Sequence, residues 1–246
     1  MASYRFGKHP KKSDYRTLQM GNYMEESLAP PPNAYSVLDN VYGKLKVSDP
    51  SVLFPMDGND QYGDCTIAAL AHSITVFRGL VGKKSIMSKS AVTKLYMHLT
   101  GGVDSGMNEL DVLNYWRKHS VSGDEILAYV SINPKNHDHV KQAMKLFGGV
   151  YIGFQCQQAC LQDFEAHKVW TPGKLTNDGH AVYAGAYNPQ GVTVLTWGST
   201  QNGTWEWWDE CVEEAYSLLP LEAKDPNFAP GFNLIQLQSD LAEVAH

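Results

Sequence analysis

The sequence predicts an α+β fold in which a helical part is followed by a part built on strands. After residue 64, apolar residues recur with the spacing of amphipathic helices as far as residue 147. In the second half, short runs rich in β-branched and aromatic residues are separated by turns that contain glycine. Helices and strands that are segregated in this way are typical of α+β domains rather than of alternating doubly wound folds.

Four helices are expected in the first part of the chain. The first begins at Cys65, immediately after Asp64, a residue type that is favoured at helix N-caps. Apolar residues then recur three and four positions apart as far as Phe77, which is typical of a helix with one buried face. The other three helices are expected at residues 88–99, 109–121 and 139–147.

Three strands are expected in the second half, at residues 148–155, 180–187 and 191–197. The stretch 156–170, between the first two strands, is expected to form one helix or an irregular helical loop. A further helix is expected around Cys211, over residues 208–219.

The first 50 residues differ from the rest of the chain. They are polar and rich in tyrosine, are interrupted by the stretch APPPNAY, and have no sustained helical or strand period. We therefore expect an N-terminal extension or arm over residues 1–50, followed by a domain over 51–246 with a C-terminal tail from about residue 217.

Charge and hydropathy exclude several classes of partner. The chain has 246 residues and a net charge of −6, with acidic and basic residues interspersed, so it lacks the broad cationic surface that nucleic-acid binding needs. No apolar run approaches the roughly 20 residues that cross a bilayer, and the first residues lack the apolar core of a secretory signal. We expect no nucleic acid or membrane partner, and a cytoplasmic or virion-associated location.

The cysteines are expected to be free thiols. Four cysteines are too few for a disulfide scaffold, and none forms a C-x-x-C pair. His137 and His139 flank Asp138, but they have no further ligands at a convincing spacing. No metal and no organic cofactor is expected.

The position of Cys65 suits a nucleophile. A helix N-terminus carries about half a positive charge, which favours the thiolate, although the neighbouring Asp64 opposes this effect. Such a thiol normally needs a histidine as its base. His72 lies about 10 Å further along the same helix, whereas His180 stands at the head of a predicted strand beside a glycine, which can aim its imidazole at the thiol.

Three stretches carry a resemblance to a known family. QYGDCTIAALAH, then DGHAVYAGAY, then VLTWGSTQNGTW follow one another in the order found in the papain-like cysteine peptidase superfamily, which this chain resembles over about residues 55–216. The resemblance implies a two-lobed fold, with a helical lobe followed by an antiparallel β-sheet or barrel lobe. It also suggests a divergent member from a bacterium or a phage.

The resemblance also assigns roles to individual residues. Cys65 matches the nucleophile of the family and His180 matches its base. Asn59 matches the glutamine whose amide helps to hold the oxyanion, and Gln61 is the second choice because its spacing differs by two residues. Trp197 matches the tryptophan that shields the partner of the histidine from water.

One expected residue is absent. The family usually has an asparagine or an aspartate two residues before the tryptophan, where this chain has Leu195. Thr196 is adjacent, but strand alternation would point it to the opposite face unless a bulge intervenes. Asn188 and Asn202 are nearby polar alternatives. A Cys-His pair can act without the third member.

Two functions remain open at this point. The first is a thiol hydrolase that cleaves a peptide or other amide bond in a peptide or protein substrate, without a cofactor. The second is a papain-like module that has lost catalysis and serves in binding or structure, for instance in a phage particle. Residues 1–50 would then make a self-association or assembly contact, or they could lie in the site of their own domain as an inhibitory segment.

Overall fold

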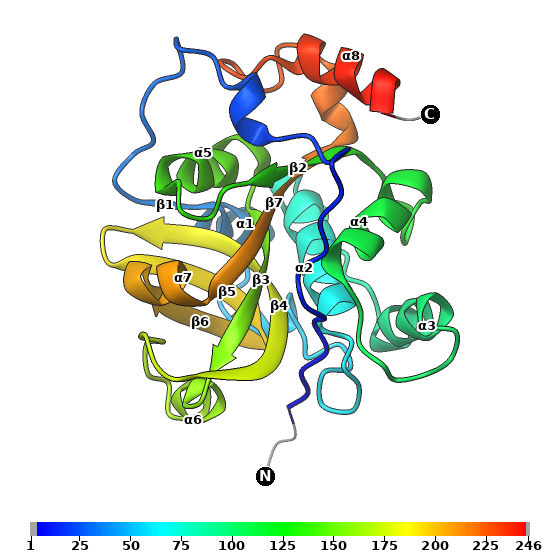
Figure 1. Ribbon diagram of the computed structural model, residues 1–246, viewed down its shortest axis with the longest axis vertical. Coiled ribbons are helices and arrows are strands. Elements are labelled where there is room, and N and C mark those ends of the chain that lie inside the picture. The colour runs from blue at the N-terminus through cyan, green and yellow to red at the C-terminus, as the bar shows by residue number, and fades with distance from the viewer. Residues whose placement is uncertain (1–3, 245–246) are drawn as a thin grey trace.

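The computed structural model describes residues 4–244 and combines helices with one large sheet (Figure 1). The first four helices lie before the main strands: α1 (Val37–Leu45), α2 (Cys65–Leu80), α3 (Lys89–Leu99) and α4 (Glu109–Lys118). The later helices are α5 (His137–Phe147), α6 (Cys160–Glu165), α7 (Trp205–Cys211) and α8 (Leu234–Val244). Three short 3-10 turns are η1 (Met20–Tyr23), η2 (Pro50–Val52) and η3 (Leu221–Lys224).

The sheet is antiparallel between neighbouring strands. Its order is β2-β7-β3-β4-β5-β6, and the short β1 pairs with β4 outside this path. The strands are β1 (Tyr35–Ser36), β2 (Ile126–Ile132), β3 (Val150–Gln157), β4 (Leu175–Asn188), β5 (Gly191–Thr196), β6 (Ser199–Thr204) and β7 (Val212–Pro220). The fold is therefore α+β with an antiparallel sheet, as the segregated patterns predict.

The sheet separates two hydrophobic clusters. One cluster packs α5, α7 and α8 against one face of the strands, and the other packs α1 to α4 against the opposite face. Strand alternation divides β4 between them, since Val182 belongs to the first cluster and Tyr183 to the second. Neighbouring strand residues thus face opposite clusters, except where a register shift interrupts the alternation.

Helix α2 is the central helix of the second cluster. It begins at Cys65, as predicted, and almost all of its residues are buried. Asp64 occupies the N-cap position, but its side chain makes no capping hydrogen bond. It accepts instead from the side-chain amide of Asn59, because Asp64 is itself buried and its carboxyl group needs a donor.

The helix expected at 208–219 is wrong beyond Cys211. Helix α7 ends there, and the chain continues directly into β7, which pairs with β2 on one side and β3 on the other. The apolar residues of this stretch fit both periods, and pairing on both sides satisfies the strand backbone. Strand β2, which pairs with β7, has no counterpart among the predicted strands.

Some residues before position 50 pack into the core of the fold. Ser36 caps α1, whose residues Val37 and Val41 are fully buried against the helical cluster. At the other end of the chain, α8 packs near η1, and Tyr23 donates a hydrogen bond to Asp240 at 2.7 Å. Within residues 4–244, no helix combines the length and the apolar character needed to cross a bilayer.

Candidate active site

The predicted nucleophile and the predicted base come from two elements that pack together. Cys65 opens α2, His180 lies in β4, and α2 packs along β4. The backbone N–H groups of Ala181 and Gly7 partly offset the raised pKa of the Cys65 thiol, which indicates that both lie close to its sulphur. The thiol therefore lies against the peptide that directly follows His180.

Both side chains are held in their neutral forms. Cys65 and His180 are each 0% exposed. Burial, with a smaller contribution from Asp64, raises the pKa of the Cys65 thiol to about 12. Burial likewise lowers the pKa of His180 to about 3. These shifts favour a neutral thiol and a neutral imidazole over an ion pair in the described form.

The His180 ring is fixed on two sides. Its Nε2 atom lies 2.8 Å from the hydroxyl oxygen of Thr196. The indole of Trp197 stacks on the imidazole, with ring centroids 4.3 Å apart and planes 18° apart. Nδ1 has no hydrogen-bond partner among the described residues. When Nε2 carries the proton and donates to Thr196, Nδ1 is left as the acceptor.

Strand parity explains why Thr196 takes this position. Leu195 is fully buried in the helical cluster with α2, on the face where the resemblance expected an orienting side chain. Its neighbour Thr196 consequently faces the other side of β5, where the His180 side chain lies. Trp197 follows in the tight turn between β5 and β6 and has a φ of 46°, which turns its ring back onto the imidazole.

The two candidate oxyanion donors lie in different surroundings. Asn59 is buried, and its side-chain amide donates to Asp64. Burial raises the pKa of that Asp64 carboxyl group to about 7. Gln61 is exposed, and its amide reaches only Asp60, at 3.5 Å. Of the two, Asn59 is therefore the one enclosed beside the start of α2.

Comparison with solved structures shows which fold this chain shares. The chain is similar to the crystal structure of xylellain, a cysteine protease from Xylella fastidiosa, with a TM-score of 0.67 and 16% identity, covering 89% of this chain and 97% of that one. The fold is papain-like. No protein-family model matches the sequence, and a comparison with curated proteins found no match.

Two further structures share the papain-like fold. ProCathepsin B S9 from Trypanosoma congolense matches with a TM-score of 0.60 and 11% identity, covering 87% of this chain and 86% of that one. The cysteine protease and lectin-like domains of Cwp84, a surface layer associated protein of Clostridium difficile, match with a TM-score of 0.56 and 13% identity. This chain covers 56% of the Cwp84 chain, and 88% of its own length is matched.

In this papain-like fold the N-terminal residues 4–12, called here the covering segment, run across the site. In Figure 1 they form the dark blue trace that passes in front of α2, between the sheet and helices α3 and α4. Backbone hydrogen bonds fix the path: Arg5 N–H donates to Asn59 O at 2.7 Å, and Lys8 N–H donates to Gly179 O at 3.1 Å. Met107 donates to Gly7 O and accepts from the His9 N–H, both at 2.8 Å.

Side chains of the covering segment seal the site. The ring of Phe6 packs edge-on against His180 and Trp197, with centroids 5.8 and 5.9 Å away. At Gly7 the segment approaches the loop before α2 so closely that a Cβ atom would lie 1.9 Å from the carbonyl oxygen of Gly63. The burial of Cys65 and His180 therefore depends on residues far away in the sequence.

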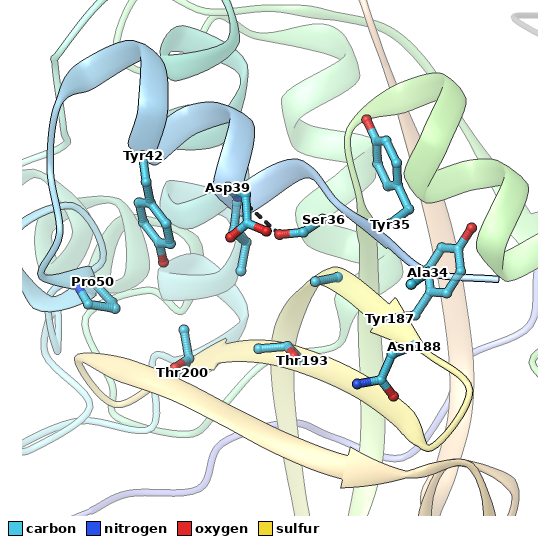
Figure 2. A pocket seen from close by; sticks show the side chains of 12 residues that line it. Ala34, Tyr35, Ser36, Asp39, Tyr42, Pro50, Tyr187, Asn188, Thr193 and Thr200 are labelled. Atoms are coloured by element: carbon cyan, nitrogen blue, oxygen red, sulfur yellow. Dashed lines mark hydrogen bonds between the residues drawn. The ribbon is translucent and has the colours of Figure 1, made fainter. Parts of the chain in front are cut away.

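The described residues also include the other thiols and form a surface hollow. Cys156, Cys160 and Cys211 are buried and free. Among residues 4–244, no group of three or more His, Cys, Asp or Glu side chains is placed to hold a metal ion. Figure 2 shows a hollow between α1 and strands β4, β5 and β6, in which Tyr42 faces Thr193 and Thr200. Of the residues named for the site, Asn188, a polar alternative for the third member, lines it, and Cys65, His180, Asn59 and Thr196 do not.

Proposed function

We propose that this chain is a papain-like thiol hydrolase that cleaves a peptide or other amide bond through Cys65 and His180. One observation carries the proposal. A cysteine at a helix start lies against the peptide that follows a buried histidine, and that histidine is held through Nε2 by Thr196 with its Nδ1 left unpartnered among the described residues.

The proposed reaction uses the free thiol of Cys65 and Nδ1 of His180, which has no hydrogen-bond partner among the described residues. In the described form Nδ1 of His180 makes no hydrogen bond to the Cys65 sulphur, so the imidazole must turn toward α2 when the site opens. Nδ1 of His180 then takes the proton of the Cys65 thiol, and the thiolate attacks the carbonyl carbon of the amide. The C–N bond breaks as His180 returns the proton to the leaving amine, which leaves a thioester on Cys65. Water, deprotonated by His180, then hydrolyses the thioester and restores the thiol. Asn59 would donate to the tetrahedral oxyanion after exchanging its hydrogen bond with Asp64.

We also propose that the described form is latent. The covering segment occupies the position where a carbonyl would have to approach Cys65, and its burial of the site raises the pKa of the thiol and lowers that of the imidazole. Proton transfer from a thiol to such an imidazole is unfavourable. Displacement of residues 4–12 would admit water and substrate together and would bring both pKa values toward their ordinary ranges.

The test uses a variant that opens the site within the full chain. In Gly7→Ala, the new methyl group collides with the backbone of Gly63, so the covering segment must move away. We expect Gly7→Ala to hydrolyse members of a quenched-fluorescence peptide library at least tenfold faster than the unmodified chain. Adding Cys65→Ser or His180→Ala should abolish the gain.

A matched control is available elsewhere in the chain. Gly43 lies in α1, and a Cβ atom there would meet nothing within 4 Å, so Gly43→Ala should leave the rate unchanged. If Gly7→Ala exposes Cys65 to alkylation but produces no cleavage that depends on Cys65, catalysis is absent. The non-catalytic binding or structural module would then be the better description.

A further inference from the structure

We propose that the site beside Cys65 recognises a lysine side chain of its peptide substrate. This inference rests on the proposed function, because it names the substrate class of the same site. The recognising residues are Glu109, Gly153, Glu213 and Glu214, called here the lysine site. In the described form it is filled by Lys8 of the covering segment.

The side chain of Lys8 is buried among polar acceptors. Its side chain is 1% exposed, although lysine is rarely buried unless it is paired. The ammonium nitrogen lies 3.0 Å from a carboxylate oxygen of Glu213 and 3.0 Å from one of Glu214, and it donates to His9 O at 3.1 Å. The ammonium group thus donates hydrogen bonds to Glu213 and His9 O and forms an ion pair with Glu214.

The shape of the site fits a long unbranched stem. Residue 153 in β3 is a glycine, and a Cβ atom there would lie 2.0 Å from Cε of Lys8 and 2.5 Å from a carboxyl oxygen of Glu109. Any side chain at this position would fill the space that the lysine stem occupies. Gly153 thus provides the room, and the carboxyl groups close the far end.

The acidic groups of the site favour a cation. Glu109 is 0% exposed, Glu214 is 1% exposed, and neither carboxyl oxygen of Glu109 has a hydrogen-bond partner among the described residues. Burial and the adjacent Glu214 raise the pKa of Glu109 well above its ordinary range. Tyr216 holds Glu214 through a hydrogen bond of 2.9 Å. Buried acids are costly without a partner, which the ammonium group supplies.

The location ties the lysine site to the reaction centre. Lys8 follows Gly7, whose backbone N–H helps to lower the pKa of the Cys65 thiol, and the Lys8 N–H donates to the carbonyl oxygen of Gly179, the residue before His180. A peptide lying across Cys65 can therefore place a side chain in this site while its neighbouring residue stands over the thiol. A substrate with lysine next to that residue would replace every contact of Lys8.

The first experiment measures how strongly the ammonium group anchors the covering segment. The rate of alkylation of Cys65 by a small electrophile is followed by peptide mass spectrometry in the full-length chain. Lys8→Met keeps the stem and removes the charge, and we expect the rate to rise at least tenfold. Lys12→Met is the matched control, because Lys12 pairs with Asp111 at the surface with 53% of its side chain exposed, and it should change the rate less than twofold.

The second experiment asks whether the site selects lysine in another molecule. A peptide with the sequence of residues 4–12 is added to the Lys8→Met chain, and we expect it to slow alkylation at least fivefold. The same peptide with methionine in place of lysine should not protect at equal concentration. Glu214→Gln should remove the difference between the peptides. If Lys8→Met fails to fold, Glu213→Gln takes its place, because Glu213 is 40% exposed and tolerates change.

Clear outcomes would overturn the proposal. Equal effects of Lys8→Met and Lys12→Met, or equal protection by the two peptides, would mean that the site does not recognise lysine. Neither measurement needs turnover, so a catalytically inert chain would still give the expected protection. If the chain cleaves peptides at rates that do not depend on a lysine in the substrate, this inference is wrong, whereas the proposed hydrolase function still holds.

Discussion

Nε2 of His180 and the hydroxyl oxygen of Thr196 lie 2.8 Å apart across two neighbouring strands. Both residues are buried, so this hydrogen bond fixes the direction of the imidazole without competition from water. In the proposed reaction, Thr196 is therefore a positioning residue that acts through His180.

Two replacements of Thr196 should distinguish the contribution of its hydroxyl group from that of its side-chain volume. Thr196→Val keeps the volume and leaves a buried ring nitrogen unpaired, so we expect stability to fall by about 1–3 kcal/mol and peptide cleavage in the Gly7→Ala chain to fall roughly tenfold. Thr196→Ser restores the hydroxyl and should recover most of the rate. Urea unfolding and the fluorescence assay measure the two effects. Equal rates in the Val and Ser variants would contradict the positioning role.

Phe6 is expected to control the pKa of His180. Its ring lies 5.8 Å from the imidazole and helps to exclude water, so Phe6→Ala should raise the pKa of His180 from about 3 toward its ordinary value of 6.5. An NMR titration of the His180 ring proton measures this change. Tyr15→Ala is the control, because Tyr15 is also an aromatic residue near the N-terminus but is 98% exposed. An unchanged titration in Phe6→Ala would mean that other residues exclude the water.

Asp64 is expected to make stability fall as pH rises. Burial raises the pKa of its carboxyl group from 3.8 to about 7, so the folded chain binds this proton more tightly than the unfolded chain does. Its contribution is therefore fully present below about pH 4 and is lost as the pH rises through 7. Asp64→Asn mimics the protonated form and should be more stable than the unmodified chain at pH 8 by about 1–3 kcal/mol.

The same variant should make Cys65 easier to ionise, because the Asp64 charge contributes to the raised pKa of the thiol. Thermal unfolding at pH 5 and pH 8 tests the stability, and alkylation tests the thiol. Asp60→Asn is the control in the same loop. Asp60 pairs with Lys89 at 2.8 Å, which lowers the pKa of Asp60, so its replacement should bring no gain at pH 8.

The pH profile of Cys65 alkylation should distinguish the covered site from the open one. In the unmodified chain the pKa is about 12, so the rate should keep rising up to pH 11 without a plateau. In Gly7→Ala we expect a plateau below pH 8.5, the ordinary range for a thiol, and His180→Ala should remove it. A profile that is unaffected by His180→Ala would mean that no thiolate-imidazole pair forms.

Local patterns in the sequence were sufficient to predict several helices and strands. The N-cap residue and the apolar period placed the start of α2 at Cys65, and the run that begins at His180 lies in β4, as predicted. These features depend on residues within a few positions of one another. The helix predicted over residues 208–219 is wrong beyond Cys211, because the residues from Val212 pair with β2 and β3, which lie far earlier in the chain. When a stretch of apolar residues fits both the helical and the strand period, only its pairing with distant strands decides which structure forms.

The sequence by itself determined the elements that carry Cys65 and His180, the α+β class and the likeness to papain-like peptidases. Tertiary structure alone decided that Thr196 rather than residue 195 faces the imidazole, that residues 4–12 cover the thiol, and that Lys8 fills an acidic site. Lys8 and Glu213 are 205 positions apart in the chain. Contacts of this kind leave no local period in a sequence, because they are selected by packing and by the cost of burying charge.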